Sequence, residues 1–568
     1  MFGNKKTATL DSGRVAPASD AKKKAKVQQG RWLERGLSSQ RVLMNGLDEG
    51  LSPIPGSHRH KLFQVVKLVK NGHLFFLQQS DLYNSNVFRC NFFGAPYIAV
   101  IDFKGIKALF DTNKVEKEPG FGNFRFNKDL LDGYIPSMFT NGEQHRKQKE
   151  FLIKIAKSMK MQTLLPTILD IMPEHLIKWN FKEGKGTATQ EEWEERILLL
   201  SSDIMSETLL GIRLDGDAFL NWRFEVLKKT KKDCKGQPKG KHRIALGAFE
   251  HLQASIANSP NIDRIYKTAA KYGLSEEEAV LEILWMLNFN AGPGTGAAMR
   301  SAAARISIMS VKEKDELRQE IKTYLGTIGL NLKTLKKMKK LDAFTMEVLR
   351  IHPPVALYFA KARKSFVLES NSGKFRIRKG ERLLGNCHIA QRDPSEFIVD
   401  GCKGVDEFDY KRFLVNPDLK SKVLCSHGMM SESPSPSNHK CAGAHVGIIT
   451  LKTFILYLIL FCDWELEEKP YWTRTTLIRY GNPDEPIRLK TFKYTRDKEE
   501  LLLPDEQTDS AESTGDELDG CPDLRCPIPK HFQDPNEEIM LMTDDDNGGD
   551  RKEGDDDDDD HKDYVDDR

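Results

Sequence analysis

The chain is 568 residues long, with 86 basic and 83 acidic side chains, and it is 39% hydrophobic, so it can bury a substantial core. Its nine scattered cysteines are odd in number and include no CxxC pair. This usage argues against a disulfide framework and indicates a reduced, intracellular protein.

The formal net charge of +3 hides an asymmetry between the two ends of the chain. Residues 501–568 hold 25 acidic and 6 basic side chains, which leaves 80 basic and 58 acidic side chains for residues 1–500. A basic body predicts peripheral contact with anionic lipid, or with carboxylate substrates held at a surface. The plainer alternative is a solvated, lysine-rich surface, and we expect no nucleic-acid partner.

At the N-terminus, residues 1–50 are predicted to form a flexible basic arm. Residues 1–36 are polar and lack an apolar stretch, and Asp11, Asp20 and the lysine run at 22–24 favour an arm over a targeting peptide. We therefore expect no secretory signal and no transmembrane anchor, in a cytoplasmic or peripherally membrane-bound protein. Residues 504–568 are predicted to be an acidic disordered tail, because the aspartate run at 555–560 repels itself.

Between these ends, residues 51–503 are expected to form a single large domain, mainly α with a minor β-sheet. Residues 86–102 alternate as paired strands do, with a turn at 94–96. Helical patterns dominate from about 105 to 350.

One of these helices begins at a capping box formed by Ser275 and Glu278 and continues through an apolar stretch to Asn290, with a local distortion expected near Pro293. Another helix, over about 341–351, ends before a pair of prolines. Short strands and turns then precede a last apolar helix over 448–461, which is too short to span a bilayer.

Three short patterns follow one another along the second half of the chain. Glu347 and Arg350 lie three apart on one helical face, where they can pair, and Arg412 could join them as a structural cluster. Cys441 then occurs in the run Asn-His-Lys-Cys-Ala-Gly, immediately before the last helix. An ExxR pair alone says little, so the interpretation depends on all three patterns together.

The position of Cys441 is suited to a thiolate. A helix N-terminus offers free N–H donors and a partial positive charge, both of which lower the pKa of a thiol. The basic residues His439 and Lys440 flank the cysteine, and Gly443 lets the helix approach a flat macrocycle without a Cβ clash. We predict that Cys441 is the axial ligand of a haem iron; the alternative is a buried free cysteine at a helix start.

In this order the three patterns resemble the cytochrome P450 superfamily, over roughly residues 50–500. The resemblance implies haem b (iron protoporphyrin IX) as the cofactor, with Cys441 as the metal ligand. It also implies that His145 and Lys149, one helical turn apart, contact the haem propionates together with Arg363, and His439 beside the cysteine is a further predicted cofactor contact. Each of these cations taken alone would be read as a solvated surface residue.

The stretch Ala-Gly-Pro-Gly-Thr at 291–295 departs from an ordinary monooxygenase. The superfamily usually has an acid followed by an alcohol there, and this chain keeps the alcohol, Thr295, but has Gly294 in place of the acid. The departure resembles the branch of allene oxide synthases, hydroperoxide lyases and epoxyalcohol synthases, as do residues 109–117, residues 132–137 and Asn438. That branch has a catalytic asparagine at the position of Asn290; the alternative for Asn290 is a partner for the helix kink.

This resemblance implies an enzyme of oxylipin biosynthesis, a lyase or isomerase, that cleaves the O–O bond of a fatty-acid hydroperoxide supplied by a lipoxygenase, with no reductase. The resulting alkoxyl radical gives an allene oxide, an epoxyalcohol or a hemiacetal that falls apart to aldehydes. Because Thr295 is small and polar where allene oxide synthases have an aromatic residue, we predict an epoxyalcohol synthase, with hydroperoxide lyase next. The remaining alternatives are allene oxide synthase, an NADPH-dependent monooxygenase acting through Thr295, and a non-enzymatic haem or lipid-binding protein.

Overall fold

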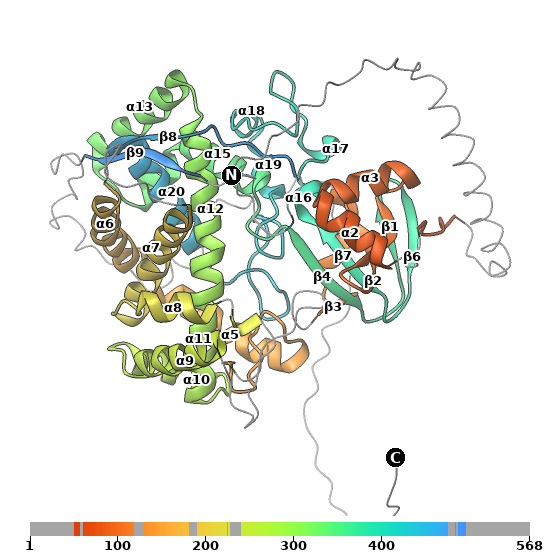
Figure 1. Ribbon diagram of the computed structural model, residues 1–568, viewed down its shortest axis with the longest axis horizontal. Coiled ribbons are helices and arrows are strands. Elements are labelled where there is room, and N and C mark those ends of the chain that lie inside the picture. The colour runs from red at the N-terminus through yellow and green to blue at the C-terminus, as the bar shows by residue number, and fades with distance from the viewer. Residues whose placement is uncertain are drawn as a thin grey trace, which may run out of the picture.

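The computed structural model describes residues 50–56, 61–118, 130–180, 190–223, 225–227, 240–474, 477, 483 and 487–495. Within these ranges a large helical region lies beside a smaller region built around a sheet (Figure 1). The expected class, mainly α with a minor β component, is confirmed. The acidic tail and all but the last residue of the basic arm lie outside the described residues.

The main sheet has five strands in the order β1-β2-β7-β4-β3. Strand β1 pairs antiparallel with β2, with Phe92 opposite Ala95, so the hairpin predicted within residues 86–102 is confirmed. Phe93 and Gly94 form its turn with φ values of 46° and 88°, a conformation that glycine adopts without a Cβ penalty. The strands are β1 (Val87–Phe92), β2 (Ala95–Val100), β3 (Val115–Lys117), β4 (Leu357–Ala362) and β7 (Arg382–Asn386), and two further hairpins are formed by β5 (Phe366–Ser370) with β6 (Gly373–Ile377) and β8 (Cys462–Leu466) with β9 (Leu489–Tyr494).

Helices α2 and α3 pack beside the sheet and enclose a small apolar core of their own (Figure 1). Phe75 and Phe76 of α3 are buried against Phe88 of β1 and Tyr97 of β2. The first helices of the described chain are α2 (Lys61–Asn71), α3 (Leu74–Tyr83) and α4 (Phe103–Ile106), followed by the 3₁₀ turn η1 (Lys107–Leu109).

The helical region holds the larger core and is crossed by one long helical run. This run begins at the predicted capping box, where the Glu278 N–H donates to Ser275 Oγ over 3.1 Å and the Ser275 N–H donates to Glu278 Oε2 over 2.9 Å. The helices here are α5 (Gly142–Ser158), α6 (Met161–Lys178), α7 (Gln190–Leu210), α8 (Gly216–Arg223), η3 (Glu225–Leu227), α9 (Lys241–Ala257), α10 (Ile262–Lys271), α11 (Glu276–Trp285), η4 (Met286–Thr295), α12 (Gly296–Ser307), α13 (Val311–Ile328), α14 (Leu332–Lys337) and α15 (Lys339–Ile351).

The middle of the long run, η4, is a π-helix of ten residues. Pro293 lies within it and cannot donate a backbone hydrogen bond, and its ring crowds the preceding turn. The distortion expected near Pro293 is therefore confirmed, but it extends over the whole segment. Wide helical turns of this kind occur frequently at functional sites.

After α15, which ends before the two prolines as predicted, short elements lead to the last long helix. They are α16 (Cys387–Ala390), α17 (Pro394–Phe397), α18 (Arg412–Val415) and α19 (Leu419–Lys422), and the last helix is α20 (Ala444–Phe461). This helix begins four residues earlier than expected, so the expectation that it is too short to span a bilayer is wrong. Among the described residues α20 alone is long and apolar enough to cross a membrane, but 67% of it is buried inside the fold. Its one charge, Lys452, is paired with Asp342 of α15 at 2.5 Å, which allows a lysine to lie within an apolar helix.

Candidate active site

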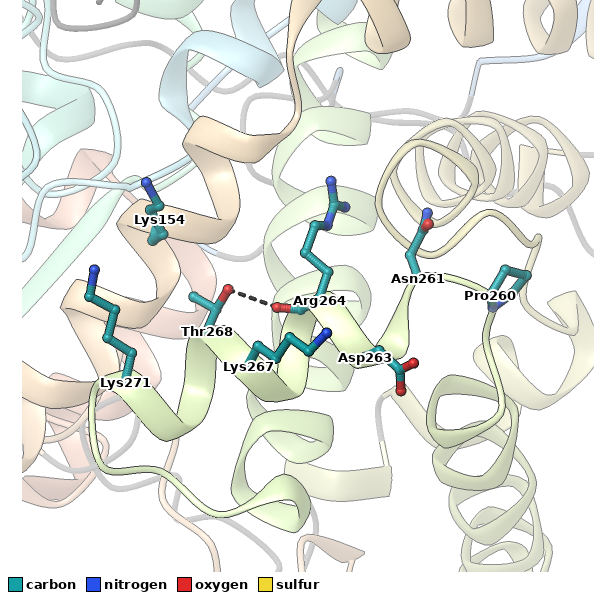
Figure 2. A pocket seen from close by; sticks show the side chains of 8 residues that line it. All are labelled: Lys154, Pro260, Asn261, Asp263, Arg264, Lys267, Thr268 and Lys271. Atoms are coloured by element: carbon teal, nitrogen blue, oxygen red, sulfur yellow. Dashed lines mark hydrogen bonds between the residues drawn. The ribbon is translucent and has the colours of Figure 1, made fainter. Parts of the chain in front are cut away.

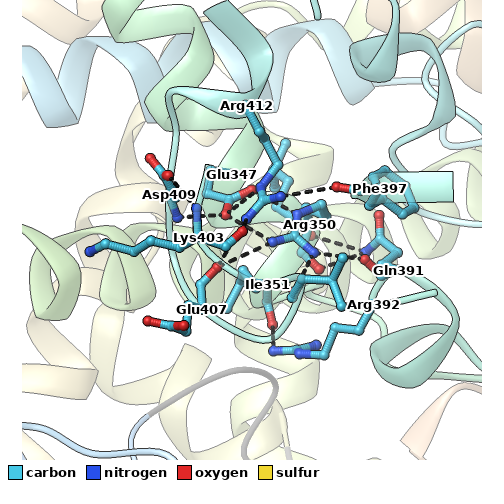
Figure 3. A network of polar contacts seen from close by, with 12 residues as sticks. Glu347, Arg350, Ile351, Gln391, Arg392, Phe397, Lys403, Glu407, Asp409 and Arg412 are labelled. Atoms are coloured by element: carbon cyan, nitrogen blue, oxygen red, sulfur yellow. Dashed lines mark hydrogen bonds and ion pairs between the residues drawn. The ribbon is translucent and has the colours of Figure 1, made fainter. Parts of the chain in front are cut away.

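The predicted cluster of Glu347, Arg350 and Arg412 is present and fully buried (Figure 3). Arg350 donates from Nε and Nη2 to the two oxygens of Glu347 over 2.7 and 2.8 Å, and Arg412 Nε donates to Glu347 Oε1 over 3.1 Å. The N–H of Asp409 adds a fourth hydrogen bond to the same carboxylate, at 2.8 Å.

The second positive charge of this cluster is shared among backbone carbonyl oxygens. Arg350 Nη1 donates to the carbonyls of Gln391 and Val405, each over 2.8 Å, and Arg412 Nη1 donates to the Phe397 carbonyl over 3.0 Å. Each buried donor therefore has an acceptor, which is the condition for burying ions without a large penalty. The cluster fixes the segment between α15 and α18 that leads to the cysteine.

Cys441 lies three residues before α20, in a turn whose backbone is fixed on both sides. Its N–H donates to the Ser426 carbonyl over 3.1 Å, and its carbonyl accepts from the Ala444 N–H over 3.4 Å. The Cys441 side chain is half-buried, although most of α20 is deeply buried. The N-cap residue Gly443 makes no side-chain cap, so the positive end of the helix dipole faces the cysteine loop.

Two of the predicted cofactor contacts, His145 and Lys149, lie buried on α5 and reach the cysteine loop directly. The ring nitrogens of His145 lie 2.9 Å from the Ser137 carbonyl and 3.1 Å from the Asn438 carbonyl. These two acceptors favour a protonated ring, but burial has the larger effect and lowers the pKa of His145. Lys149 Nζ donates to the Lys440 carbonyl, and burial lowers the pKa of Lys149 to about 8.

His439, the third predicted contact, packs its ring against that of His145 with 4.1 Å between centroids. Burial, followed by the charge of His145, holds the pKa of His439 well below its ordinary range. The structure thus brings His145, Lys149, His439 and Cys441 into one cluster, which we call the cysteine-loop cluster. Within the described residues, no group of three or more His, Cys, Asp or Glu side chains could hold a bare metal ion.

Three further basic residues lie in the cysteine-loop cluster, and the sequence analysis assigned them no role as ligands. Lys117, at the end of β3, contacts His427 Nε2 through its Nζ, and burial lowers the pKa of Lys117 to about 7. His427 has a left-handed backbone with φ 66°, and its N–H donates to the Tyr358 hydroxyl over 3.2 Å. Lys440 Nζ donates to the Met429 carbonyl over 2.6 Å and so braces the loop.

The other predicted cofactor contact, Arg363, is exposed at the end of β4. Its N–H donates to the Lys114 carbonyl over 2.9 Å. The nearby Thr112 hydroxyl donates to the Ser437 carbonyl over 2.7 Å, which ties this end of the sheet to the cysteine loop. No contact among the described residues joins the Arg363 side chain to the cysteine-loop cluster, so its role stays a prediction.

The segment at 132–137, one of those that resemble the hydroperoxide-converting branch, is joined to the long helical run through a buried acid. Glu282 of α11 accepts hydrogen bonds from the Tyr134 hydroxyl over 2.8 Å and from Ser137 Oγ over 2.5 Å. Burial raises the pKa of Glu282 despite these donors. Because the Ser137 carbonyl contacts His145, Glu282 positions the cysteine-loop cluster from the side of the long helical run.

The predicted catalytic residues Asn290 and Thr295 both lie on η4. Asn290 and Gly294 are half-buried, and a Cβ added at Gly294 would have only the Phe289 carbonyl oxygen near it, at 3.8 Å. Thr295 faces α20: its Oγ1 lies 3.2 Å from the position of a Cβ added at Gly447. The catalytic roles of Asn290 and Thr295 stay predictions.

One other asparagine of η4 is unlike Asn290. The Asn288 side chain is fully buried, and neither its Oδ1 nor its Nδ2 has a hydrogen-bond partner among the described residues. A buried amide without partners costs folding free energy. Asn288 therefore offers a natural control for experiments on Asn290.

The surroundings of Cys441 suit a haem in three respects. A half-buried thiol lies at the positive end of a helix, and a Cβ added at Gly443 would meet no atom within 4 Å, so the face beside the cysteine is open. Buried cations whose pKa values are lowered by burial gather around the loop, as a cofactor with carboxylate groups requires.

The chain is similar to several known proteins. The family model described as cytochrome P450 matches residues 269–490, which include η4 and Cys441. A divinyl ether synthase of Nicotiana tabacum is 25% identical over 444 residues, covering 72% of this chain and 91% of the relative. A chloroplastic allene oxide synthase of Linum usitatissimum is 26% identical over 413 residues, covering 68% and 76%.

Among solved structures, the cyanobacterial protein CYP120A1 with bound retinoic acid has a similar fold. The TM-score is 0.56 with 17% sequence identity, and the match covers 78% of this chain and all of that one. At this identity the likeness concerns the fold alone.

Proposed function

This chain belongs to the cytochrome P450 superfamily, and we propose that it converts fatty-acid hydroperoxides without dioxygen or a reductase. When bound through the Cys441 thiolate, haem b would supply the homolytic cleavage of the substrate O–O bond, which an electron-donating thiolate assists. The protein would hold the cofactor, orient the substrate and control which product forms.

The cysteine-loop cluster would hold the cofactor. The Cys441 thiolate would be the iron ligand, and His145, Lys149 and His439 would pair with the propionates, joined by Lys117. Their pKa values are lowered now by burial, so a carboxylate placed among them would restore their charges and gain strong hydrogen bonds. Arg363, at the end of β4, is a further candidate partner on the side of the sheet.

The single observation that carries the proposed reaction type is Gly294. Reduction of dioxygen requires a proton relay beside the bound oxygen, and the position of the usual acid carries no side chain here. Losing a general acid costs typically a factor of 10²–10⁴ in rate. A hydroperoxide already contains the O–O bond, so its cleavage does not need this acid.

Asn290 would orient the substrate. Its half-buried amide lies on the same π-helical segment as Gly294, where a side chain can face the cofactor space without being sealed in the core. An amide N–H donated to the hydroperoxide would fix which oxygen meets the iron. Such a donor acts on the reacting atoms and would therefore change turnover more than cofactor binding.

For the product we propose an epoxyalcohol, because Thr295 is small where an aromatic side chain would steer the radical elsewhere. Hydroperoxide lyase and allene oxide synthase activities are the alternatives, and the names of the relatives add divinyl ether synthase, which the sequence analysis did not consider. Incubating the purified haem protein with 13-hydroperoxy linoleate, without NADPH, and identifying the products separates them. A dominant aldehyde, ketol or divinyl ether yield would contradict the epoxyalcohol assignment.

The role of Asn290 is tested by a matched pair of isosteric changes, Asn290→Leu and Asn288→Leu. We expect Asn290→Leu to lower hydroperoxide turnover by about 10²–10³, as removal of one positioned hydrogen-bond donor does, while haem content is retained. Asn288→Leu should keep turnover within a few-fold, because the Asn288 amide has no partner to lose. Equal effects of the two changes would refute an orienting role for Asn290.

The Thr295 hydroxyl is the one observation in favour of an NADPH-dependent monooxygenase. If that hydroxyl relays protons, Thr295→Val should abolish reductase-supported oxidation. For hydroperoxide conversion, the same isosteric change should leave the rate within about threefold. Oxygen consumption with NADPH and a reductase, compared with hydroperoxide loss without them, distinguishes the two functions.

We propose that a lipoxygenase supplies the substrate. We also propose that the protein is cytoplasmic or peripherally bound to a membrane. The flax relative is named chloroplastic, so organelle import is the alternative outcome for this chain. Fractionation of cells expressing the full chain with a C-terminal tag would show cytosolic or salt-extractable protein. Protease-protected, shortened protein inside an organelle would contradict the proposed location.

A further inference from the structure

A basic hollow lies between α5 and α10, and it is separate from the cysteine loop in the residues that line it. Its volume is about 480 Å³, and it is open to solvent. Lys154 of α5 and Arg264, Lys267 and Lys271 of α10 contribute four positive charges, against one negative charge from Asp263 (Figure 2). The charged ends of Lys154, Arg264 and Lys271 are directed to the same side of the hollow (Figure 2).

These charges are not neutralised within the fold. Across the part of the chain that the structure describes, none of the four cations forms an ion pair, and the Arg264 side chain makes only a hydrogen bond to the Leu209 carbonyl at 3.3 Å. Lys154, Arg264, Lys267 and Lys271 are all exposed. Four unpaired cations around one concave surface create a local positive potential that favours an anionic occupant.

We propose that the occupant is the acidic C-terminal segment of the same chain, residues 501–568, through the aspartates at 555–560. This segment carries 25 acidic and 6 basic side chains, while residues 1–500 carry a net charge of +22. The two parts are therefore complementary in charge, and in near-equal amount. The hollow is positively charged and the tail is negatively charged, so the two attract each other.

The tail belongs to the same molecule as the hollow, and this favours it over free anions. Fifty-nine residues lie between Thr495, the last described residue, and Asp555, and a flexible linker of that length would have a root-mean-square span of about 40 Å. Tethering also gives the aspartate run an effective concentration on the order of millimolar, far above that of most free anions of similar charge. A tail held in this way would mask a basic surface of the body from anionic lipid.

Carbodiimide crosslinking of the full-length haem protein, followed by mass spectrometry, tests this inference. At low ionic strength we expect amide links from Lys154, Lys267 or Lys271 to residues 555–560, within one molecule. Because the Debye length falls to about 3 Å in 1 M salt, these links should drop at least fivefold there. Mixing isotope-labelled and unlabelled protein separates links within a molecule from links between molecules.

Two variants of the full chain make the test specific. The pair Lys267→Gln with Lys271→Gln should reduce the links to Lys154 at least fivefold, whereas Lys336→Gln with Lys337→Gln, exposed lysines on α14, should not change them. Links spread evenly over exposed lysines, links between molecules, or no effect of the first pair would overturn the inference.

Two other outcomes would assign the hollow to another occupant. Neutralising the tail by changing residues 555–560 to Asn should increase binding to phosphatidylserine vesicles, because the hollow is then uncovered. Vesicle binding that depends on Lys267 and Lys271 but is unchanged by neutralising the tail would overturn the proposal in favour of lipid. NADPH-driven reduction by an added reductase that is lost in the Lys267→Gln, Lys271→Gln pair would overturn it in favour of an acidic redox partner.

Discussion

Two regions of this protein bury cations, and they do so in opposite ways. Around Glu347, the guanidinium groups of Arg350 and Arg412 meet a carboxylate and backbone carbonyls, and every donor is satisfied inside the fold. Around Cys441, Lys149 and His145 are buried and Lys117 and His439 are half-buried, and this burial lowers the pKa values of all four. The first region is complete as a structure, whereas the second is suited to receive an anionic cofactor.

Because the Glu347 cluster is complete in itself, a substitution there should reduce folding stability more than a substitution near Cys441. Glu347→Gln would leave two buried arginines without a counter-charge, and breaking a buried ion pair from one side typically costs about 3–5 kcal/mol. We expect little soluble, folded haem protein, measured as the yield and the midpoint of urea unfolding. Glu396→Gln, which removes a partly exposed partner of Lys422, is the control and should cost less than about 1 kcal/mol. Similar midpoints for the two variants would contradict the account of the Glu347 cluster.

Changes in the second region should affect the cofactor more than the fold. Lys149→Met removes a buried cation while keeping the length of its side chain, and a hydrogen bond to a charged group contributes about 1.5–3 kcal/mol. Haem should therefore dissociate at least about tenfold faster to an apoprotein acceptor, with the thermal midpoint of the haem-free form unchanged or higher. Lys154→Met, on the exposed face of the same helix, should leave haem dissociation as in the wild type. An unchanged dissociation rate in Lys149→Met would remove it from the cofactor site.

The pH dependence of stability gives a finer distinction. The pKa of Lys149 is lowered to about 8 in the fold, so between about pH 8 and its ordinary value of 10.5 the unfolded chain binds more protons. Stability of the haem-free protein should consequently rise with pH, and Lys149 should contribute about 1 kcal/mol of that rise between pH 7 and 9. Urea unfolding of wild type and Lys149→Met at both pH values measures the difference. Parallel slopes would mean that Lys149 is not a buried cation in solution.

Sequence reasoning recovered the parts of this site that depend on local spacing. A pair three residues apart on a helix must lie on one face, so Glu347 and Arg350 could be joined without a structure. The capping box at Ser275 was also predicted, because its two hydrogen bonds involve residues three apart. The hairpin at 86–102 could be predicted for the same reason, because its two strands are close in sequence.

What the sequence could not predict depends on contacts between distant segments. Lys117 and His427 are 310 positions apart and meet only because β3 and the cysteine loop converge in the fold. Glu282 looks like any helical acid until Ser137 and Tyr134 are seen to close around it. The ten-residue extent of the π-helix could not be predicted from Pro293, because tertiary packing decides how far such a distortion spreads.

The central claim is that Cys441 serves a reaction in which the substrate brings its own O–O bond. Its most direct test is consumption of 13-hydroperoxy linoleate by the purified haem protein under anaerobic conditions, without NADPH or a reductase. We predict the same rate and products as in air, and loss of activity in Cys441→Ser. Consumption that requires both dioxygen and a reduced partner protein would contradict the claim.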